Sequence, residues 1–279
     1  REECLYGSVE QNIYSKYSIQ FNLSIMRTVL ITGASSGIGE ACARVLASES
    51  NYRLLLCARR VNRLEKLRDR ILDSYPDCEI FCFELDVRER EQVEMALNNL
   101  PADWNSIDIL INNAGLSQGL ESLENGDTGD WDRMIDTNVK GLLYVTKYCI
   151  PKMVNSGMPH IINLGSIAGK EVYPKGNVYC ATKHAVDALT QAMRIDLLEK
   201  GIKVTSIDPG MVETEFSEVR FKGDKERAQD VYKGLTPLCG QDIAEIIAFV
   251  LSRPAHVNIN DLLVMPTAQA TGTIVKRTS

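Results

Sequence analysis

The sequence has no long apolar run, few histidines and no excess of positive charge. A membrane-spanning helix needs about 20 consecutive apolar residues, so nothing in the chain is expected to cross a membrane. The only histidines are His160, His184 and His256, and none has metal-ligand spacing to a pair of cysteines. The net charge of -6 provides no drive to displace counterions from nucleic acid. These absences argue against a metal protein, a membrane protein and a DNA- or RNA-binding protein.

The eight cysteines form no CxxC pair, and most lie in apolar segments such as RLLLCA and EIFCFEL. This distribution is typical of reduced, buried thiols in a cytoplasmic enzyme. Residues 1–25 lack an initiator Met and the apolar core of a signal peptide, whereas Met26 directly precedes the first expected strand. We interpret residues 1–25 as a disordered or non-native extension.

From Met26 onward, apolar runs alternate with segments of helical periodicity. We expect strands at 27–32, 53–58, 79–85, 107–112, 160–165, 202–208 and 261–265. We expect helices at 37–49, 61–74, 89–98, 130–154, 177–199 and 241–252. Continuous Val, Ile and Leu runs indicate strands buried on both faces. The pattern predicts one α/β domain over 26–279, a doubly wound Rossmann-type parallel sheet of about seven strands with helices on both faces. The long irregular segment 209–240 is expected to be a substrate lid.

A glycine-rich loop, TGASSGIG, follows the first expected strand and opens the first helix. Such a loop lets a pyrophosphate approach the backbone, and the helix N-terminus supplies free N–H groups. The spacing is GxxxGxG, and a glycine-rich turn without a ligand is the alternative. The residues expected to bind the cofactor here are Gly33, Ser35, Ser36, Gly37, Ile38 and Gly39.

The ends of the next strands extend this interpretation to a whole dinucleotide. Arg59 and Arg60 follow the second strand, and guanidinium groups suit the 2′-phosphate of NADP(H), although they could simply cap a solvated helix. Asp86 and Val87 end the third strand and could contact the adenine. The fourth strand ends in NNAG, either a plain turn or a close approach to a ribose, with Asn113, Ala114 and Gly115 as the candidates.

Tyr179 and Lys183 are four residues apart on an expected helix and share one face. An ammonium group beside a phenol favours the phenolate, so this tyrosine could exchange a proton with an alcohol or carbonyl oxygen. The pair alone also fits a solvated helix face. Ser166 lies 13 residues earlier, after a strand, and could hold the substrate oxygen. It does not stand in a hydrolase GxSxG elbow, because Leu164 occupies the place of the first glycine.

Taken together, TGASSGIG, NNAG, Asn138, Ser166, the Tyr179–Lys183 pair and Pro209-Gly210 resemble the short-chain dehydrogenase/reductase family from Met26 to about residue 266. The resemblance implies a catalytic tetrad of Asn138, Ser166, Tyr179 and Lys183. In it, Asn138 anchors a water of the proton relay and Lys183 binds the nicotinamide ribose. It also implies a cofactor-lining stretch that includes Pro209, Gly210, Val212 and Thr214.

The segments LPADWNSIDILINNAG, GNVYCATK, VETEFSEVRFKGD and PAHVNIN resemble the NADP-dependent 3-hydroxy acid dehydrogenase branch, also called serine or L-allo-threonine dehydrogenases. This resemblance implies small substrates: serine, allo-threonine, 3-hydroxyisobutyrate and, as reduction product, 3-hydroxypropionate. It also implies a homotetramer. Arg220, in the expected lid, is the candidate to bind the substrate carboxylate, with a solvated charged loop as the alternative.

Two other functions remain open. One is an NADPH-dependent carbonyl or ketoacyl reductase of broader specificity. The other is a dinucleotide-binding sensor without turnover, although such a protein has no need of all four tetrad residues.

Overall fold

The computed structural model describes residues 26–278, and the predicted extension at 1–25 lies outside them. The strands are β1 (Arg27–Thr32), β2 (Tyr52–Ala58), β3 (Ile80–Glu84), β4 (Ile109–Asn112), β5 (His160–Leu164), β6 (Lys203–Pro209), β7 (Val212–Glu213), β8 (Leu238–Cys239) and β9 (Asp261–Val264). The helices are α2 (Gly37–Ala47), α3 (Val61–Ser74), α4 (Arg90–Asn98), α5 (Thr128–Ile135), α6 (Leu142–Met153), α7 (Asn177–Asp196), α8 (Phe216–Arg220), α9 (Lys225–Asp230) and α10 (Gly240–Leu251).

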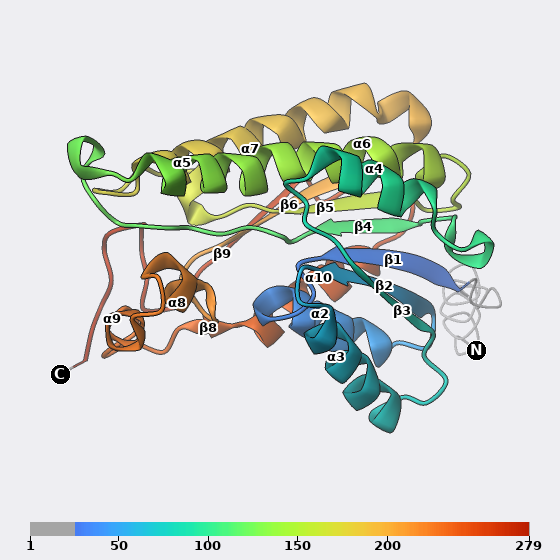
Figure 1. Cartoon of the computed structure of the whole chain (residues 1–279), viewed down its shortest axis with the longest axis horizontal. Coiled ribbons are helices and arrows are strands. Elements are labelled where there is room, and N and C mark those ends of the chain that lie inside the picture. Colours follow the sequence, from blue (N-terminus) through green and yellow to red (C-terminus); the bar gives the residue numbers. More distant parts are fainter. Residues whose placement is uncertain (1–25, 279) are drawn as a thin grey trace, which may run out of the picture.

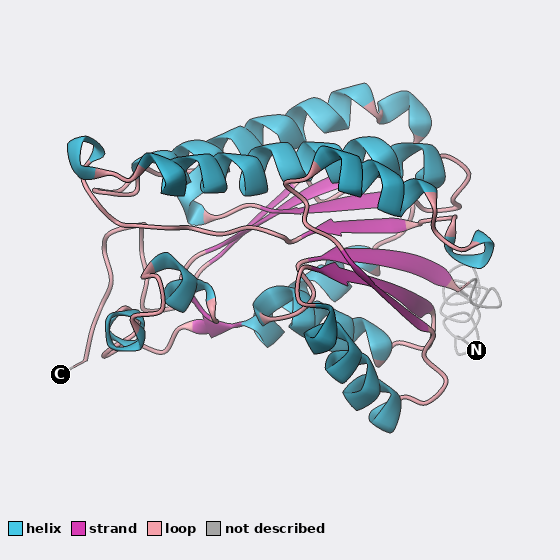
Figure 2. Ribbon diagram, in the orientation of Figure 1, coloured by secondary structure: helices cyan, strands magenta, loops and turns pink. Residues whose placement is uncertain are grey.

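Seven of these strands form one parallel sheet in the order β3-β2-β1-β4-β5-β6-β9. Helices cover both of its faces, with α4, α6 and α7 on one and α2, α3 and α10 on the other (Figures 1 and 2). Adjacent strand residues point to opposite faces: Val29 and Ile31 pack with the second group of helices and Leu30 with the first. The predicted fold class is confirmed, because both faces of each central strand are buried.

The long helix expected over 130–154 is found as a continuous helical stretch, but it contains a π-helical turn that was not predicted. The structure has α5, then a π-helical turn at Asp136–Gly141, then α6. Buried positions continue through the turn, from Met134 to Val145. The apolar pattern therefore resembles that of one continuous helix. A π-turn adds a residue to a helix without interrupting that pattern, and such turns occur frequently at functional sites.

The segment 209–240, expected to be irregular, contains short regular elements. β7 and β8 pair in parallel as a separate two-stranded sheet, and α8 and α9 lie between them in the chain. Figure 1 shows α8 and α9 beyond the carboxyl ends of the large sheet's strands. Elements this short give too little periodicity to be recognised in a sequence. Within residues 26–278, no helix is both long enough and apolar enough to cross a bilayer.

The core around α3 gives a stability prediction. Leu67 is 1% exposed and packs against the sheet, whereas its neighbour Lys66 is exposed. Leu67→Ala should lower the free energy of unfolding by about 2–5 kcal/mol, because it removes buried methyl groups and leaves a cavity. Lys66→Ala, the matched control on the same helix, should change it by about 0.5 kcal/mol or less. Equal effects of the two variants in urea unfolding would contradict the placement of α3.

Candidate active site

A cavity of about 460 Å³ opens at the carboxyl edge of the large sheet. It is lined by the loops that follow β1 to β6 and by residues of the segment 209–240. A doubly wound sheet binds its ligands at this edge. The predicted site residues that line it are Gly33, Ser35, Ser36, Gly37, Ile38, Arg59, Arg60, Asp86, Val87, Asn113, Ala114, Gly115, Ser166, Tyr179, Lys183, Pro209, Gly210, Val212, Thr214 and Arg220. Two predicted residues, Gly39 and Asn138, lie behind this lining. Within residues 26–278, no cluster of His, Cys, Asp or Glu side chains could hold a metal ion.

The glycine loop is shaped for a ligand at the start of α2. Gly33 and Gly37 have φ angles of +66° and +58°, a conformation that other residues adopt only with strain. The loop is fixed to the β4 end by Asn113, whose side-chain Nδ2 donates to the Thr32 carbonyl at 2.8 Å. The Thr32 hydroxyl in turn accepts the main-chain N–H of Ala114 at 3.0 Å. Two of the predicted cofactor loops are thus held together before any ligand enters.

Gly39 has a packing role rather than a lining role. A side chain there would collide with Asn113 Nδ2 and lie 2.6 Å from the Gly33 carbonyl oxygen. Its lack of a side chain lets the first turn of α2 approach the loop after β4.

The end of β2 carries the cations predicted to select the cofactor. Arg60 donates to the hydroxyls of Ser35 at 3.3 Å and Ser36 at 2.9 Å. It also pairs with Glu215 at 3.1 Å, and Arg63 pairs with the same carboxylate at 2.6 Å. Burial would raise the pKa of Glu215, but the two arginines hold it below its ordinary value. Because Glu215 lies more than 150 positions from both arginines, only the folded chain reveals this pairing.

A third guanidinium was missed from the sequence. Arg88 lines the same cavity and holds the Asp86 carboxylate through its Nε at 2.9 Å and its Nη2 at 2.5 Å. Burial acts to raise the pKa of Asp86, but the hydrogen bonds and charge of Arg88 hold it below the ordinary value. Arg88 has no motif around it, so its two-residue spacing from Asp86 is the only signal that could have pointed to it.

Tyr179 and Lys183 both face the cavity from α7, and they are 8% and 7% exposed. The Lys183 ammonium donates to the Leu164 carbonyl at 2.8 Å and lies 6.0 Å from the centre of the Tyr179 ring. Ser166 follows β5, and its hydroxyl accepts the N–H of Ala168 at 3.1 Å. The fold therefore brings together three of the four predicted catalytic side chains at the cavity wall.

The electrostatics of Tyr179 differ in one respect from the expectation. Burial raises the pKa of its phenol, and the neighbouring Tyr173 adds to the rise. The positive charge that opposes them is that of Arg220, aided by a hydrogen bond from Ser166. Burial lowers the pKa of Lys183 to about 8, against the charge of Asp208. Two cations thus surround this phenol, whereas the sequence pointed to Lys183 alone.

Asn138 lies in the π-helical turn and is buried. Its side-chain oxygen accepts the N–H of Leu116, and its side-chain nitrogen donates to the Leu116 carbonyl and the Thr182 hydroxyl, at 2.8, 2.8 and 3.0 Å. The amide is engaged on both ends, so it ties the loop after β4 to α7. Both N–H groups of this amide are used, whereas its oxygen can accept one further hydrogen bond.

Arg220 is held in place rather than solvated. Its Nε donates to the Ser117 hydroxyl at 3.0 Å and its Nη2 to the Tyr173 hydroxyl at 3.1 Å. Its guanidinium carbon lies 5.2 Å from the ring centres of both Tyr179 and Phe216, within range of cation–π attraction. Ser117, Tyr173 and Phe216 were missed from the sequence, because nothing in their local patterns marks them.

The fold and this arrangement of side chains define a Rossmann-type oxidoreductase site. A family model described as short chain dehydrogenase matches residues 27–225, and the chain belongs to this family. Among curated relatives, the NADP-dependent 3-hydroxy acid dehydrogenase YdfG of Escherichia coli (strain K12) is 44% identical over 243 residues, covering 87% of this chain and 96% of that protein. Sulfoacetaldehyde reductase 2 of Chromohalobacter salexigens is 42% identical over 87% of this chain and 95% of its own length.

Solved structures agree with this assignment. The closed form of serine dehydrogenase complexed with NADP+ has a TM-score of 0.83 and 42% identity, covering 90% of this chain and all of that one. Serine dehydrogenase from Escherichia coli has a TM-score of 0.74 and 39% identity, with 87% of this chain and 99% of that one covered. The predicted family and branch resemblance are confirmed.

The close packing at Gly39 gives a prediction for the cofactor site. Gly39→Ala should push Asn113 and the Gly33 carbonyl apart, weakening NADPH binding by about tenfold or more, as expected when a preorganised loop is displaced by a fraction of an ångström. The measurement is the Kd of NADPH by fluorescence titration. Gly157→Ala is the control, since no atom lies within 4 Å of its Cβ. An unchanged Kd in Gly39→Ala would show that this contact does not shape the loop.

Proposed function

We propose that the protein is an NADP(H)-dependent oxidoreductase that interconverts small 3-hydroxy acids and the corresponding 3-oxo acids. The observation that carries this proposal is the place of Arg220, a half-buried guanidinium fixed beside the ring of Tyr179. A guanidinium can bind a carboxylate in a bidentate manner. An acid held there would present its hydroxyl or carbonyl carbon close to the tyrosine. Relatives named as 3-hydroxy acid and serine dehydrogenases support this substrate class.

In this proposal the side chains around the cavity have the following tasks. Tyr179 exchanges a proton with the substrate oxygen, as the acid in reduction and the base in oxidation. Ser166 holds that oxygen by a hydrogen bond. Arg220 supplies positive charge that opposes the effect of burial on the phenol. Lys183, with its ammonium 6.0 Å from the ring centre, is assigned a second positive charge beside it. The bound nicotinamide supplies or accepts the hydride.

NADP(H) is the proposed cofactor. Arg59 and Arg60 line the cavity at the end of β2, and Arg60 already bonds both serines of the glycine loop. These donors suit a 2′-phosphate, and the curated relatives and the bound serine dehydrogenase structure carry NADP in their names. The segment 209–240 would close over this cofactor and the substrate as a lid.

Three further assignments accompany the proposal. We infer a homotetramer, supported by exposed apolar side chains on the contacting helices α4 and α6: Met95, 64% exposed, and Leu143, 39% exposed. We infer a cytoplasmic location, supported by cysteines that are all free within residues 26–278. We infer one domain over 26–279.

The decisive experiment is a comparison of NADP⁺ and NAD⁺ reduction with L-serine, L-allo-threonine and 3-hydroxyisobutyrate. NADP⁺ should be strongly preferred, and Tyr179→Phe should lower kcat by at least about a hundredfold, because it removes the proton-exchanging group. Neutral ketones and sulfoacetaldehyde complete the panel with NADPH. Faster turnover of neutral ketones would favour a broader carbonyl reductase, and bound NADPH without any turnover would favour a sensor.

Arg220→Ala gives a separate prediction about the substrate. Losing a charged hydrogen bond to a carboxylate should raise KM for acid substrates about tenfold or more, while neutral ketones keep their KM. Lys225→Ala, an exposed residue of the same lid, is the control and should leave both unchanged. Equal losses on acids and neutral ketones would mean that Arg220 supports Tyr179 without binding the carboxylate.

A further inference from the structure

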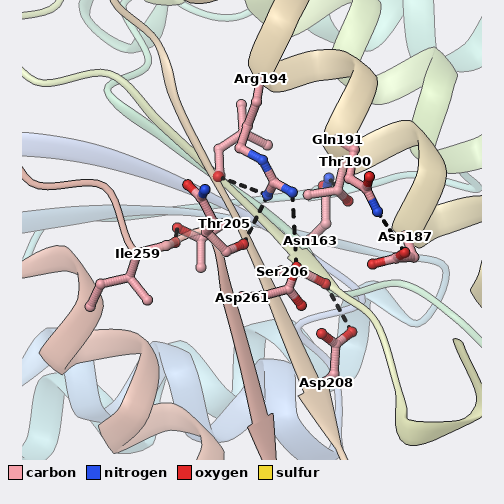
Figure 3. Close-up of polar contacts among 12 residues, drawn as sticks. Asn163, Asp187, Thr190, Gln191, Arg194, Thr205, Ser206, Asp208, Ile259 and Asp261 are labelled. Carbon is pink, nitrogen blue, oxygen red and sulfur yellow. Dashed lines mark hydrogen bonds and ion pairs between the residues drawn. The ribbon is translucent and has the colours of Figure 1, made fainter. Parts of the chain in front are cut away.

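A buried carboxylate stands directly behind the proposed catalytic serine. Asp208 belongs to β6 and is 1% exposed. Its Oδ1 accepts the main-chain N–H of Ser166 at 3.2 Å and the hydroxyl of Ser206 at 2.8 Å. Figure 3 shows the bond from Ser206 to Asp208, with Asp261 of the neighbouring strand beside them.

Gly165, the residue before Ser166, has no side chain and so leaves room for this carboxylate. A side chain at Gly165 would overlap Asp208 Oδ1 and lie 2.9 Å from the Ser206 hydroxyl. The carboxylate therefore occupies the space where the residue at 165 would otherwise place its Cβ. Gly165 and Asp208 form a complementary pair, and together they fix where the chain turns out of β5 into Ser166.

A network of charged groups from several neighbouring segments lies beside Asp208. The Lys170 ammonium lies 3.4 Å from its Oδ2 and also pairs with Asp187 of α7 at 2.5 Å and with Asp261 of β9 at 2.7 Å. Arg194 of α7 lies 3.9 Å from Asp261. On the cavity side, the charge of Asp208 raises the pKa of Lys183. Asp208 is thus linked to both the surface cluster and the catalytic lysine.

The balance of these groups sets the charge of Asp208. Burial raises its pKa above the ordinary value of an aspartate, and Asp261 adds to the rise. The hydrogen bond from Ser206 and the charge of Lys170 act in the opposite direction and lower the pKa. A carboxylate is costly to bury unless it is paired, and β6 could be completed by an apolar or amide residue without that cost. Its presence next to Ser166 therefore calls for a role in the site.

We propose that Asp208 is a positioning residue that holds Ser166 in its catalytic orientation, and that it works as an ionised carboxylate kept charged by Lys170. This inference rests on the role of Ser166 in the proposed function. An ionised acceptor makes a stronger hydrogen bond to the Ser166 N–H than a neutral one. Protonation of Asp208 loosens the turn after β5, so turnover falls as the pH drops through the pKa of Asp208.

The test is the pH profile of kcat in the reduction direction, with the full chain, NADPH and a 3-oxo acid, measured for wild type, Asp208→Asn and Lys170→Met. In this direction protonated Tyr179 is the active form, so Tyr179 adds no acidic limb of its own. Asp208→Asn should lower kcat about fivefold to tenfold at the optimum and remove the acidic limb, since an amide is permanently neutral. Lys170→Met should move the acidic limb to higher pH, because the cation that favours the ionised form is gone. Lys66→Met, far from the site on α3, should leave the limb in place.

Two controls separate positioning from folding and from the proposed function. The NADPH Kd of both variants, by fluorescence, should stay within about twofold of wild type, because Asp208 does not line the cavity. If Asp208→Asn does not fold, the test rests on Lys170→Met alone. An acidic limb at the same pH in Lys170→Met as in wild type would then overturn the proposal. The proposal is also overturned if Asp208→Asn folds and keeps both the kcat and the acidic limb of wild type. Ser166→Ala with undiminished turnover would instead refute the assigned role of Ser166.

Discussion

Parallel pairing of β1, β4, β5 and β6 aligns their carboxyl ends along one edge of the sheet, and every part of the site depends on this alignment. At the end of β1, the Thr32 hydroxyl accepts a hydrogen bond from the loop after β4. At the end of β5, the Leu164 carbonyl accepts a hydrogen bond from the Lys183 ammonium. Asp208 of β6 reaches back to the Ser166 N–H. Contacts made across neighbouring strands thus position the glycine loop, the serine and the lysine relative to one another.

Burial and positive charge have opposite effects on the pKa of Tyr179. Burial provides the water-free surroundings that a proton transfer coupled to hydride transfer needs, but it raises the pKa of the phenol. The charge of Arg220 opposes this rise in the pKa, and the ammonium of Lys183, on the same helix as Tyr179, lies 6.0 Å from the ring centre. Because Arg220 belongs to the segment 209–240, the charge beside Tyr179 depends on how this segment packs.

The sequence was informative wherever a pattern is local. The seven strands of the large sheet were placed within two residues of their observed ends, because continuous apolar runs are a strong local signal. The glycine loop and the Tyr179–Lys183 pair were found because a loop spacing and a helical repeat are read from neighbouring residues. Nearly all of the predicted residues line one cavity.

The remainder depends on contacts between distant segments. Glu215 pairs with residues more than 150 positions away, and Asp208 meets Ser166 across two strands. Neither pairing has a signature in its own segment.

The π-turn at Asn138 preserves the buried pattern of a plain helix, so periodicity alone could not show it. Gly39 and Asn138 were chosen from motifs, and the fold gives both a supporting place behind the cavity wall.

The central claim is that Tyr179 is the acid/base of this site and that neighbouring positive charge brings its phenol to a usable pKa. The most direct measurement is a near-ultraviolet titration of tyrosinate, taken as the difference between wild type and Tyr179→Phe, with and without NADP⁺. The account predicts that the pKa of Tyr179 falls when NADP⁺ is bound, because a further positive charge then lies beside the buried phenol. A pKa that is the same in the free and the NADP⁺-bound protein would contradict it.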